Sequence, residues 1–177
     1  MTDAREYGRA LYMLAEEENR CDEIRTDAEV VKELLRDNPE YVKLLDTPAL
    51  TKEERLAAID ESLASVDANL RNLIKILSER HSVYLLHSAL DGYFASYDKA
   101  HGIERVEAIS AVPMLEDEIE KLKRKLEKET GKTIIIKNTT DPSLLGGMKL
   151  RGMGIQLDSS LKTKLETLER SIRSAVV

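Results

Sequence analysis

The chain has 177 residues, of which 42% are hydrophobic, 34% are charged and 4% are aromatic, with no Trp. This length suits one large domain or two small ones, and the core must be built from Leu, Ile, Val and Ala. The formal net charge of −6 argues against a nucleic-acid-binding protein, because phosphate binding requires a basic surface. The single Cys21 excludes an intrachain disulfide and is typical of a reducing compartment.

The sequence contains no run of about 18 apolar residues, so we expect no segment that inserts into a membrane. The opening residues include Asp3 and Glu6 and lead directly into a helical pattern. We therefore expect neither a signal peptide nor a transit peptide.

Through the first hundred residues, apolar side chains recur at intervals of three and four, which is the period of amphipathic helices. Thr51 and Glu54 form the pattern of a capping box, and Asp67 is placed to cap the helix that follows it. Helices with short connections over this length indicate an all-α bundle. The six predicted helices cover residues 3–18, 22–37, 40–45, 51–63, 67–77 and 82–100.

After His101-Gly102 the period changes. A strand is predicted from Ile103 through Val112, closing at Pro113, and an amphipathic helix with Gly131 as its C-cap follows. A β-branched strand at residues 133–136, a hairpin and a final helix complete a β-α-β-β-α order. The apolar residues expected on the preceding amphipathic helix are Leu115, Ile119, Leu122 and Leu126.

The hairpin is predicted at residues 141–158, where apolar and polar residues alternate on either side of Gly152-Met153-Gly154. Pro142 indicates a turn at its start, and Gly146-Gly147 indicates a bulge or another backbone passing close by. Asp158 to Ser160 offer caps for the final helix. The apolar stripe of that helix is Leu161, Leu165, Leu168 and Ile172.

Together these patterns predict an α+β protein with two domains, a six-helix bundle at residues 1–102 and a small β-α-β-β-α domain at residues 103–177. The charge distribution changes near the same boundary. Residues 1–100 hold 13 Lys and Arg against 21 Asp and Glu, whereas the remaining residues hold 14 against 12.

The motifs that suggest chemistry have simpler structural interpretations. Gly131-Lys132-Thr133 invites a P-loop interpretation, but the helix precedes it and the strand follows it, the reverse of that motif. His81, His87 and His101 lack the converging spacing of a zinc site, and no base or orienting group accompanies Cys21. The sequence therefore predicts no catalytic residue, no metal site and no cofactor.

The first and fifth helices carry more apolar residues than one buried stripe requires. Ala4, Tyr7, Leu11 and Leu14 form the predicted core stripe of the first helix, and a further face holds Gly8, Tyr12, Met13 and Ala15. The fifth helix adds Ile76 to its stripe. Such helices must bury two faces, either inside the bundle or against a helix from another chain, and both interpretations remain open.

The chain resembles the delta subunit family of F-type ATP synthases, the bacterial counterpart of the mitochondrial oligomycin-sensitivity-conferring protein. The opening residues 7–12 are similar to the family's start, with Gly8 where Ala is usual, and residues 108–113 are similar to its first strand. Met153-Gly154 stands where the family has Gly-Asp. The most specific resemblance is a signature of Asp141, Gly146, Gly147, Leu150, Arg151, Asp158 and Ser160.

The resemblance implies a non-catalytic stator subunit on the cytoplasmic face of the cell membrane, without a cofactor. Such a subunit links the b subunits of the peripheral stalk to the catalytic head, so that the head does not turn with the rotor. In this family the helical domain binds the N-terminal segment of the alpha subunit between the first and fifth helices, and the second domain holds the C-terminal ends of the b subunits. The groove residues expected here are Tyr7, Leu11, Leu14, Leu73, Ile74 and Leu77.

Two alternatives belong to other classes. One is a general helical adaptor unrelated to the synthase. The other is a small nucleotide-binding protein that uses the Gly-rich hairpin.

Overall fold

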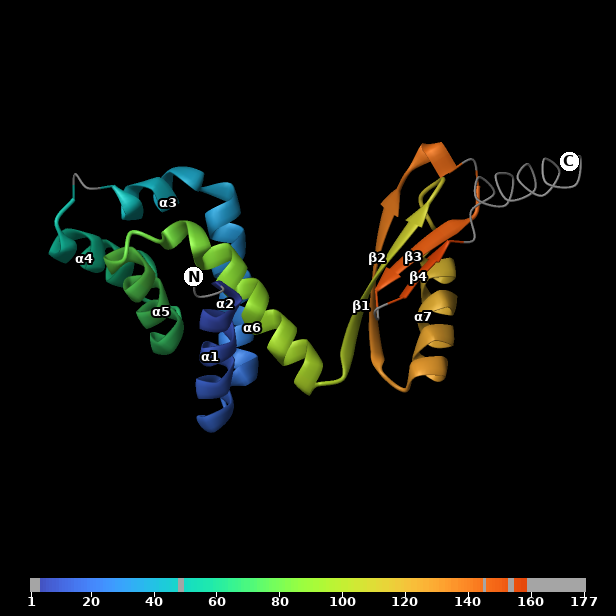
Figure 1. Cartoon of the computed structure of the whole chain (residues 1–177), viewed down its shortest axis with the longest axis horizontal. Coiled ribbons are helices and arrows are strands. Elements are labelled where there is room, and N and C mark those ends of the chain that lie inside the picture. The colour runs from blue at the N-terminus through green and yellow to red at the C-terminus, as the bar shows by residue number, and fades with distance from the viewer. Residues whose placement is uncertain (1–3, 48–49, 145, 153–154, 159–177) are drawn as a thin grey trace, which may run out of the picture. The chain divides into compact units, whose positions relative to one another are not determined.

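The computed structural model describes residues 4–47, 50–144, 146–152 and 155–158 (Figure 1). The chain divides into two compact units, Met1–Ala100 and His101–Val177. The predicted α+β class is confirmed, because helices make up the described part of the first unit and a sheet with one α-helix forms the second.

Unit 1 follows the helical periodicity closely. Its elements are α1 (Ala4–Glu17), α2 (Cys21–Asp37), α3 (Pro39–Asp46), α4 (Lys52–Ser62), α5 (Ala68–Glu79), the 3₁₀ helix η1 (Val83–Leu85) and α6 (Leu86–Ala100). The α-helix expected from Ser82 begins instead at Leu86, after η1. His81 has a φ of 50°, which interrupts regular helix, and the Val83 amide donates to Asp46 Oδ1 at 3.1 Å.

The predicted helix ends are confirmed by their hydrogen bonds. The Glu54 amide donates to Thr51 Oγ1 at 3.2 Å, and the Thr51 amide donates to Glu54 Oε2 at 2.8 Å. Asp67 Oδ1 accepts from the Asn69 amide at 2.7 Å at the start of α5. Gly131, at φ 68°, ends the helix of unit 2 in the left-handed conformation.

The closest packing in unit 1 joins α1 to α6. A Cβ atom at Gly8 would lie 1.8 Å from the Ala89 carbonyl oxygen, and one at Gly92 would lie 2.4 Å from the Arg5 carbonyl oxygen. The two helix backbones therefore touch where each has a glycine. Among the described elements, α1 packs most extensively against α6.

This contact decides which face of α1 is buried. The buried residues are Gly8, Leu11, Tyr12 and Ala15. The further face of the sequence prediction therefore faces the core together with Leu11, except for Met13, which is exposed. The predicted core stripe is therefore partly wrong. Leu14 is 39% exposed, because turning Gly8 toward α6 rotates Leu14 out of the interior.

Two tyrosines fill the space beside the glycine contact. The rings of Tyr12 and Tyr93 meet edge to face, with centroids 5.9 Å apart. The Tyr93 hydroxyl donates to the Cys21 carbonyl oxygen at 2.7 Å, and the Tyr12 hydroxyl donates to Glu16 Oε1 at 3.2 Å. Burial is the main cause that raises the pKa of Tyr12 to about 12, and it also raises the pKa of Tyr93.

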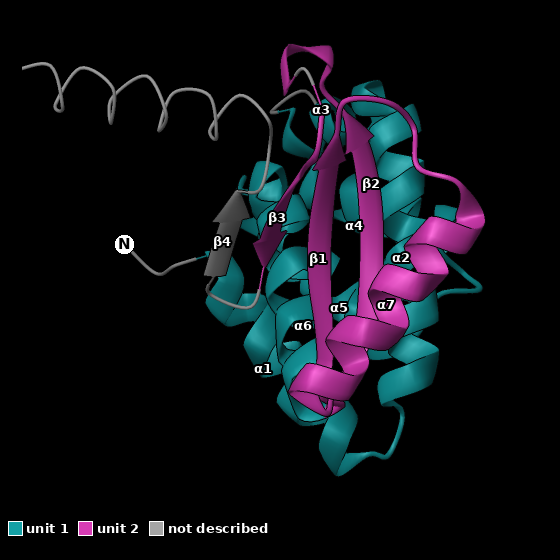
Figure 2. Ribbon diagram, turned by 90° about the vertical axis from the view of Figure 1, so that its right-hand side faces the viewer, with its two compact units in different colours: residues 1–100 teal, residues 101–177 magenta. Residues whose placement is uncertain are grey.

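The described part of unit 2 is a sheet with the α-helix α7 packed on one of its faces (Figure 2). The described elements are β1 (Ile103–Ser110), α7 (Glu116–Thr130), β2 (Thr133–Thr140), the 3₁₀ helix η2 (Pro142–Leu144), β3 (Met148–Gly152) and β4 (Ile155–Asp158). The strand order is β2-β1-β3-β4; β1 and β2 are parallel, and the other neighbours are antiparallel. Val106, Leu126 and Ile134 form the core between sheet and helix, and Leu150 packs against it.

Several details of unit 2 differ from the sequence prediction or lie beyond the described residues. The strand predicted at residues 133–136 continues to Thr140, because it pairs with β1 along its whole length. The first strand ends at Ser110 rather than Val112, because the Ser110 hydroxyl donates to the Val112 carbonyl oxygen at 2.7 Å and turns the chain. Val112 is consequently 69% exposed, and Leu115, expected in the apolar stripe, is a 70% exposed N-cap residue. The predicted final helix, with Leu161, Leu165, Leu168 and Ile172, lies outside the described residues.

Replacing Gly8 by Ala tests the glycine contact. Helix propensity alone favours Ala by about 1 kcal/mol, but the added methyl group would overlap the Ala89 carbonyl oxygen. We expect Gly8→Ala to lower the free energy of unfolding by about 1–3 kcal/mol, measured by urea denaturation. Ala10→Ser, at an exposed position of the same helix, is the control. A more stable Gly8→Ala variant would contradict the packing.

The tyrosine pair predicts a loss of stability at alkaline pH. A phenol whose pKa is raised by folding contributes fully below its ordinary value of 10.0, and the contribution declines as pH rises toward about 12 for Tyr12. Thermal unfolding followed by circular dichroism should show this decline, and Tyr12→Phe should reduce its slope. Tyr84→Phe, at a site 67% exposed, should leave the slope unchanged. Equal slopes in all three proteins would argue against a protected Tyr12.

Candidate protein-binding surface on the helical unit

Helices α1 and α5 lie antiparallel, and side chains join them at both ends. Arg80 Nη1, just after α5, donates to the Tyr7 hydroxyl near the start of α1 at 3.0 Å. At the other end, Asn69 Nδ2 donates to Glu18 Oε2 at 2.8 Å. The stretch between these two contacts is therefore bounded by polar side chains.

The six residues expected in the groove fall into two groups. Leu11, Leu73, Ile74 and Leu77 are buried in the core of unit 1. Tyr7 is half-buried, and Leu14 is exposed. Leu14 and Tyr7 therefore offer surface to a partner, whereas the buried side chains can only shape the floor on which a partner would rest.

Ile76 is the residue missing from the expected six. It is 46% exposed on α5. It lies three residues after Leu73 and four before Arg80, so it shares the α1-facing edge of α5 with both. In the sequence, the excess of apolar residues in the fifth helix is the signal that indicates Ile76.

Met13 is also exposed, by 57%, but it belongs to another surface. Adjacent helical residues differ by about 100° around the axis, so Met13 points away from the edge that holds Leu14. We define a candidate groove with Tyr7, Leu14 and Ile76 as its rim and the buried Leu11 and Leu73 as its floor.

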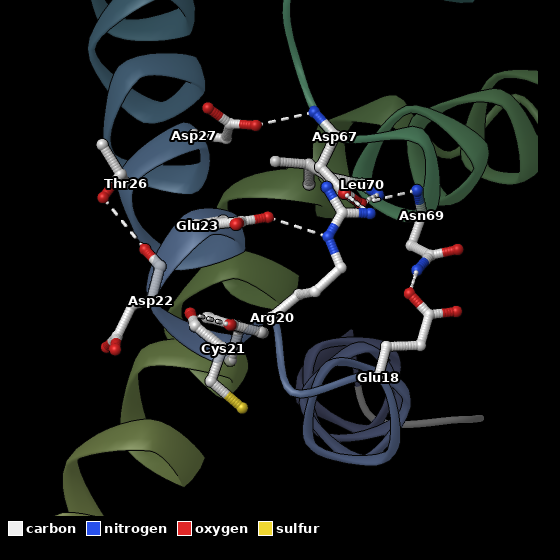
Figure 3. Close-up of polar contacts among 11 residues, drawn as sticks. Glu18, Arg20, Cys21, Asp22, Glu23, Thr26, Asp27, Asp67, Asn69 and Leu70 are labelled. Atoms are coloured by element: carbon white, nitrogen blue, oxygen red, sulfur yellow. Dashed lines mark hydrogen bonds and ion pairs between the residues drawn. The ribbon is translucent and has the colours of Figure 1, made fainter.

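A second set of contacts fixes the start of α5 beside the turn after α1 (Figure 3). Asp67 is buried, and its Oδ2 lies 2.8 Å from Arg20 Nη1. This is an ion pair without hydrogen-bond alignment, since Asp67 Oδ2 has no hydrogen-bond partner among the described residues. The Asp67 amide donates to Asp27 Oδ2 on α2 at 2.6 Å. Asp67 thus holds α5 to both earlier helices.

In unit 2, the signature residues have structural positions. Asp141 Oδ1 accepts from the Ser143 amide at 2.9 Å, which forms the turn before β3. Gly146 and Gly147 have φ values of 148° and 77°, conformations that L side chains rarely adopt. These residues shape the entry to β3.

The remaining signature residues follow β3 and β4. Leu150 packs against the core, and Arg151 Nη1 lies 4.0 Å from Glu107 Oε2. Asp158 ends β4, whereas Ser160 lies outside the described residues. The Gly-Lys-Thr sequence is a helix C-cap followed by β2, as the order of elements predicted.

The described residues bear on the kind of site that this chain can form. They contain no group of three or more His, Cys, Asp or Glu side chains able to hold a metal ion. Among the helices that the structure describes, none is long and apolar enough to cross a membrane.

Comparison with known proteins decides the family. The sequence model of the ATP synthase delta (OSCP) subunit matches residues 4–172. The chain belongs to this family. The resemblance noted in the sequence is thereby confirmed.

Relatives cover nearly the whole length of this delta-family chain. An ATP synthase subunit delta from Geobacillus sp. (strain WCH70) is 33% identical over 170 residues, 96% of each chain. One from Clostridioides difficile (strain 630) is 28% identical over 175 residues, 98% of this chain and 97% of the relative.

A solved structure supports the fold. A chain of the Toxoplasma gondii mitochondrial ATP synthase hexamer matches with a TM-score of 0.78 and 21% identity, covering 97% of this chain and 98% of that one. At this identity the match concerns the fold alone.

The contacts of Asp67 can be separated by mutation. Asp67→Ala removes both the cap of α5 and the ion pair, and we expect it to lower the free energy of unfolding by about 1–2 kcal/mol. Asp67→Asn keeps a capping oxygen and should cost less, because Arg20 retains Glu23 at 2.8 Å. Urea denaturation of both variants measures these changes in the free energy of unfolding. Equal costs would mean that the ion pair, rather than the cap, holds α5.

Proposed function

We propose that this chain is a non-catalytic stator subunit that joins the peripheral stalk of an F-type ATP synthase to its catalytic head. Its family supports this role, and so does the division into two compact units that can each hold a different partner. In this role the protein works without a cofactor, as a peripheral component on the cytoplasmic face of the cell membrane.

The six-helix bundle that we assign to residues 1–102, which includes unit 1, binds the N-terminal segment of the alpha subunit. The observation that carries the assignment is the exposed apolar rim of Leu14 and Ile76 above a buried floor, between two polar end contacts. An amphipathic helix of limited length fits such a groove, with its apolar face on the rim. The end contacts with Arg80 and Glu18 offer polar groups where that helix would begin and end.

The second domain that we assign to residues 103–177, which lies within unit 2, holds the C-terminal ends of the b subunits. The turn at Asp141 and the two glycines after it shape the entry to β3. The sheet that contains β3 would make this contact. A stator subunit opposes the torque of the rotor only while it stays bound to both partners. It therefore requires slow dissociation at two binding surfaces, and it requires no reactive group.

The groove is tested by replacing its exposed rim. Burial of one leucine side chain contributes about 1.5–3 kcal/mol, so Leu14→Asp should weaken binding of a synthetic alpha-subunit N-terminal peptide about ten- to hundredfold. Isothermal titration calorimetry gives the affinity. Leu11→Asp is a poor test, because Leu11 is buried and its loss would disturb the fold first.

Met13→Asp is the matched control, since Met13 is an exposed apolar residue of the same helix on another face. We expect it to bind the peptide like the unmodified protein. An unchanged affinity in folded Leu14→Asp, or an equal loss in both variants, would place the contact elsewhere. No binding by the unmodified protein would contradict the proposed function itself.

A further inference from the structure

The candidate groove of unit 1 has two ends of opposite charge. The contact of Arg80 with Tyr7 closes one end, and the contact of Asn69 with Glu18 closes the other. On α1, Tyr7 and Glu18 are eleven residues apart, and the same count separates Asn69 from Arg80 along α5. A helix rises about 1.5 Å per residue, so the two ends lie about 16 Å apart, which is about three helical turns.

Arg80 gives the first end its positive charge. Its side chain is exposed, and its guanidinium donates to a neutral phenol on α1. The carboxylates next to this end have partners of their own, since Glu79 pairs with Lys52 at 3.2 Å and Glu6 pairs with Arg9 at 2.9 Å. Among the described residues, Arg80 forms no ion pair. A guanidinium has five N–H donors, so Arg80 keeps donors for a partner.

The other end carries excess negative charge. Glu17 and Glu18 lie at the end of α1, and both are exposed. Glu18 accepts a hydrogen bond from an uncharged amide, which leaves its charge uncompensated by that contact. Arg20 lies near Glu18. It is already paired with Asp67 and with Glu23, each at 2.8 Å, so carboxylates outnumber cations here.

The distance between the two ends lets each charge act separately. At physiological ionic strength the Debye length is about 8 Å, which is about half the distance between the ends. A charge on a bound helix therefore interacts with the nearer end and hardly with the farther one. The dipoles of α1 and α5 add little to the difference, because in antiparallel helices the start of one lies beside the end of the other.

We propose that Arg80 and Glu18 select the direction in which an amphipathic helix of a protein partner lies in the groove. Arg80 pairs with carboxylates at one end of that helix, and Glu18 pairs with cations at its other end, with Glu17 beside it. The inference rests on the proposed function for the groove as a helix-binding site, whereas the direction follows from the charges at the two ends.

The charges of the partner helix then decide which direction this is. Helices are stabilised by acidic side chains in the first turn and by basic side chains in the last turn. A helix of that composition lies with its first turn at Arg80 and its last turn at Glu18, parallel to α1. Its own dipole, about half a charge at each end, opposes this direction, but the full charges of its side chains outweigh the dipole.

The test uses two designed helical peptides with the same leucine stripe. The first has glutamates in its first turn and lysines in its last, and the second has the reverse. A nitroxide on the first residue of the first peptide should broaden the amide NMR signal of Tyr7 about three- to tenfold more than that of Asn69 in the full chain. The second peptide should give the opposite pattern, and the difference should decline as salt rises.

Arg80→Glu with Glu18→Lys exchanges the charges of the two ends without changing the net charge. In this variant we expect each peptide to reverse its direction. Arg80→Gln with Glu18→Gln is a milder pair that should make the two directions equally populated. The matched control is Lys43→Glu with Glu40→Lys, which exchanges an exposed ion pair on α3 and should leave both directions unchanged.

Two further measurements place the peptides in the groove. Leu14→Asp should abolish the binding of both peptides, and urea denaturation checks that every variant is folded. The same direction for both peptides, or an unchanged direction in the exchange variant, would overturn the inference. It would also be overturned if neither peptide binds and sedimentation shows self-association that Leu14→Asp removes, because the groove would then belong to a second copy of the chain.

The alpha-subunit N-terminal peptide separates this inference from the proposed function. If it binds the unmodified chain and the exchange variant in the same direction, Arg80 and Glu18 do not select the direction and the proposed function stands. If it fails to bind while both designed peptides follow the charges, the selection by Arg80 and Glu18 is supported and the stator role is contradicted.

Discussion

The backbone contact between α1 and α6 is the constraint on which the binding groove depends. Gly8 faces the Ala89 carbonyl, and Gly92 faces Arg5, at separations that leave no room for a side chain. Close approach sets the rotation of α1 about its own axis, because any other rotation would put a side chain into the gap. Tyr12 and Ala15 consequently enter the core and Leu14 reaches the surface. The exposed leucine is thus a result of packing on the opposite side of its helix.

A groove also needs its two walls held at a constant distance. The contacts Arg80–Tyr7 and Asn69–Glu18 join the walls where α1 and α5 end, and Asp67 anchors α5 to Arg20 and to α2. The exposed contacts Arg80–Tyr7 and Asn69–Glu18 contribute little stability individually. Their value here is geometric, since they lie at the ends and leave the apolar middle open. A preformed groove spares a partner helix part of the ordering cost of binding.

The sequence predicts features that depend on adjacent residues of the chain. It does not predict features that depend on which other helix packs against a given one. The capping box at Thr51, the cap at Asp67 and the left-handed Gly131 depend on a few adjacent residues, and all were predictable. The buried face of α1 was not, because periodicity reveals two apolar faces without saying which one meets α6. Arg55 shows the same limit. Its charge suggests a solvated position, yet it is buried and donates to the Thr47 carbonyl oxygen at 3.3 Å.

The two units present surfaces of different physical kinds. The candidate groove of unit 1 is apolar at its rim and belongs to a unit rich in acidic residues, whereas the face of the sheet away from α7 carries charges of both signs around Ile135. Apolar burial is not weakened by the screening of charge, whereas exposed ion pairs are. A partner suited to one surface is therefore poorly suited to the other. In the proposed stator role, surfaces of different kinds on the two units would favour a different partner at each.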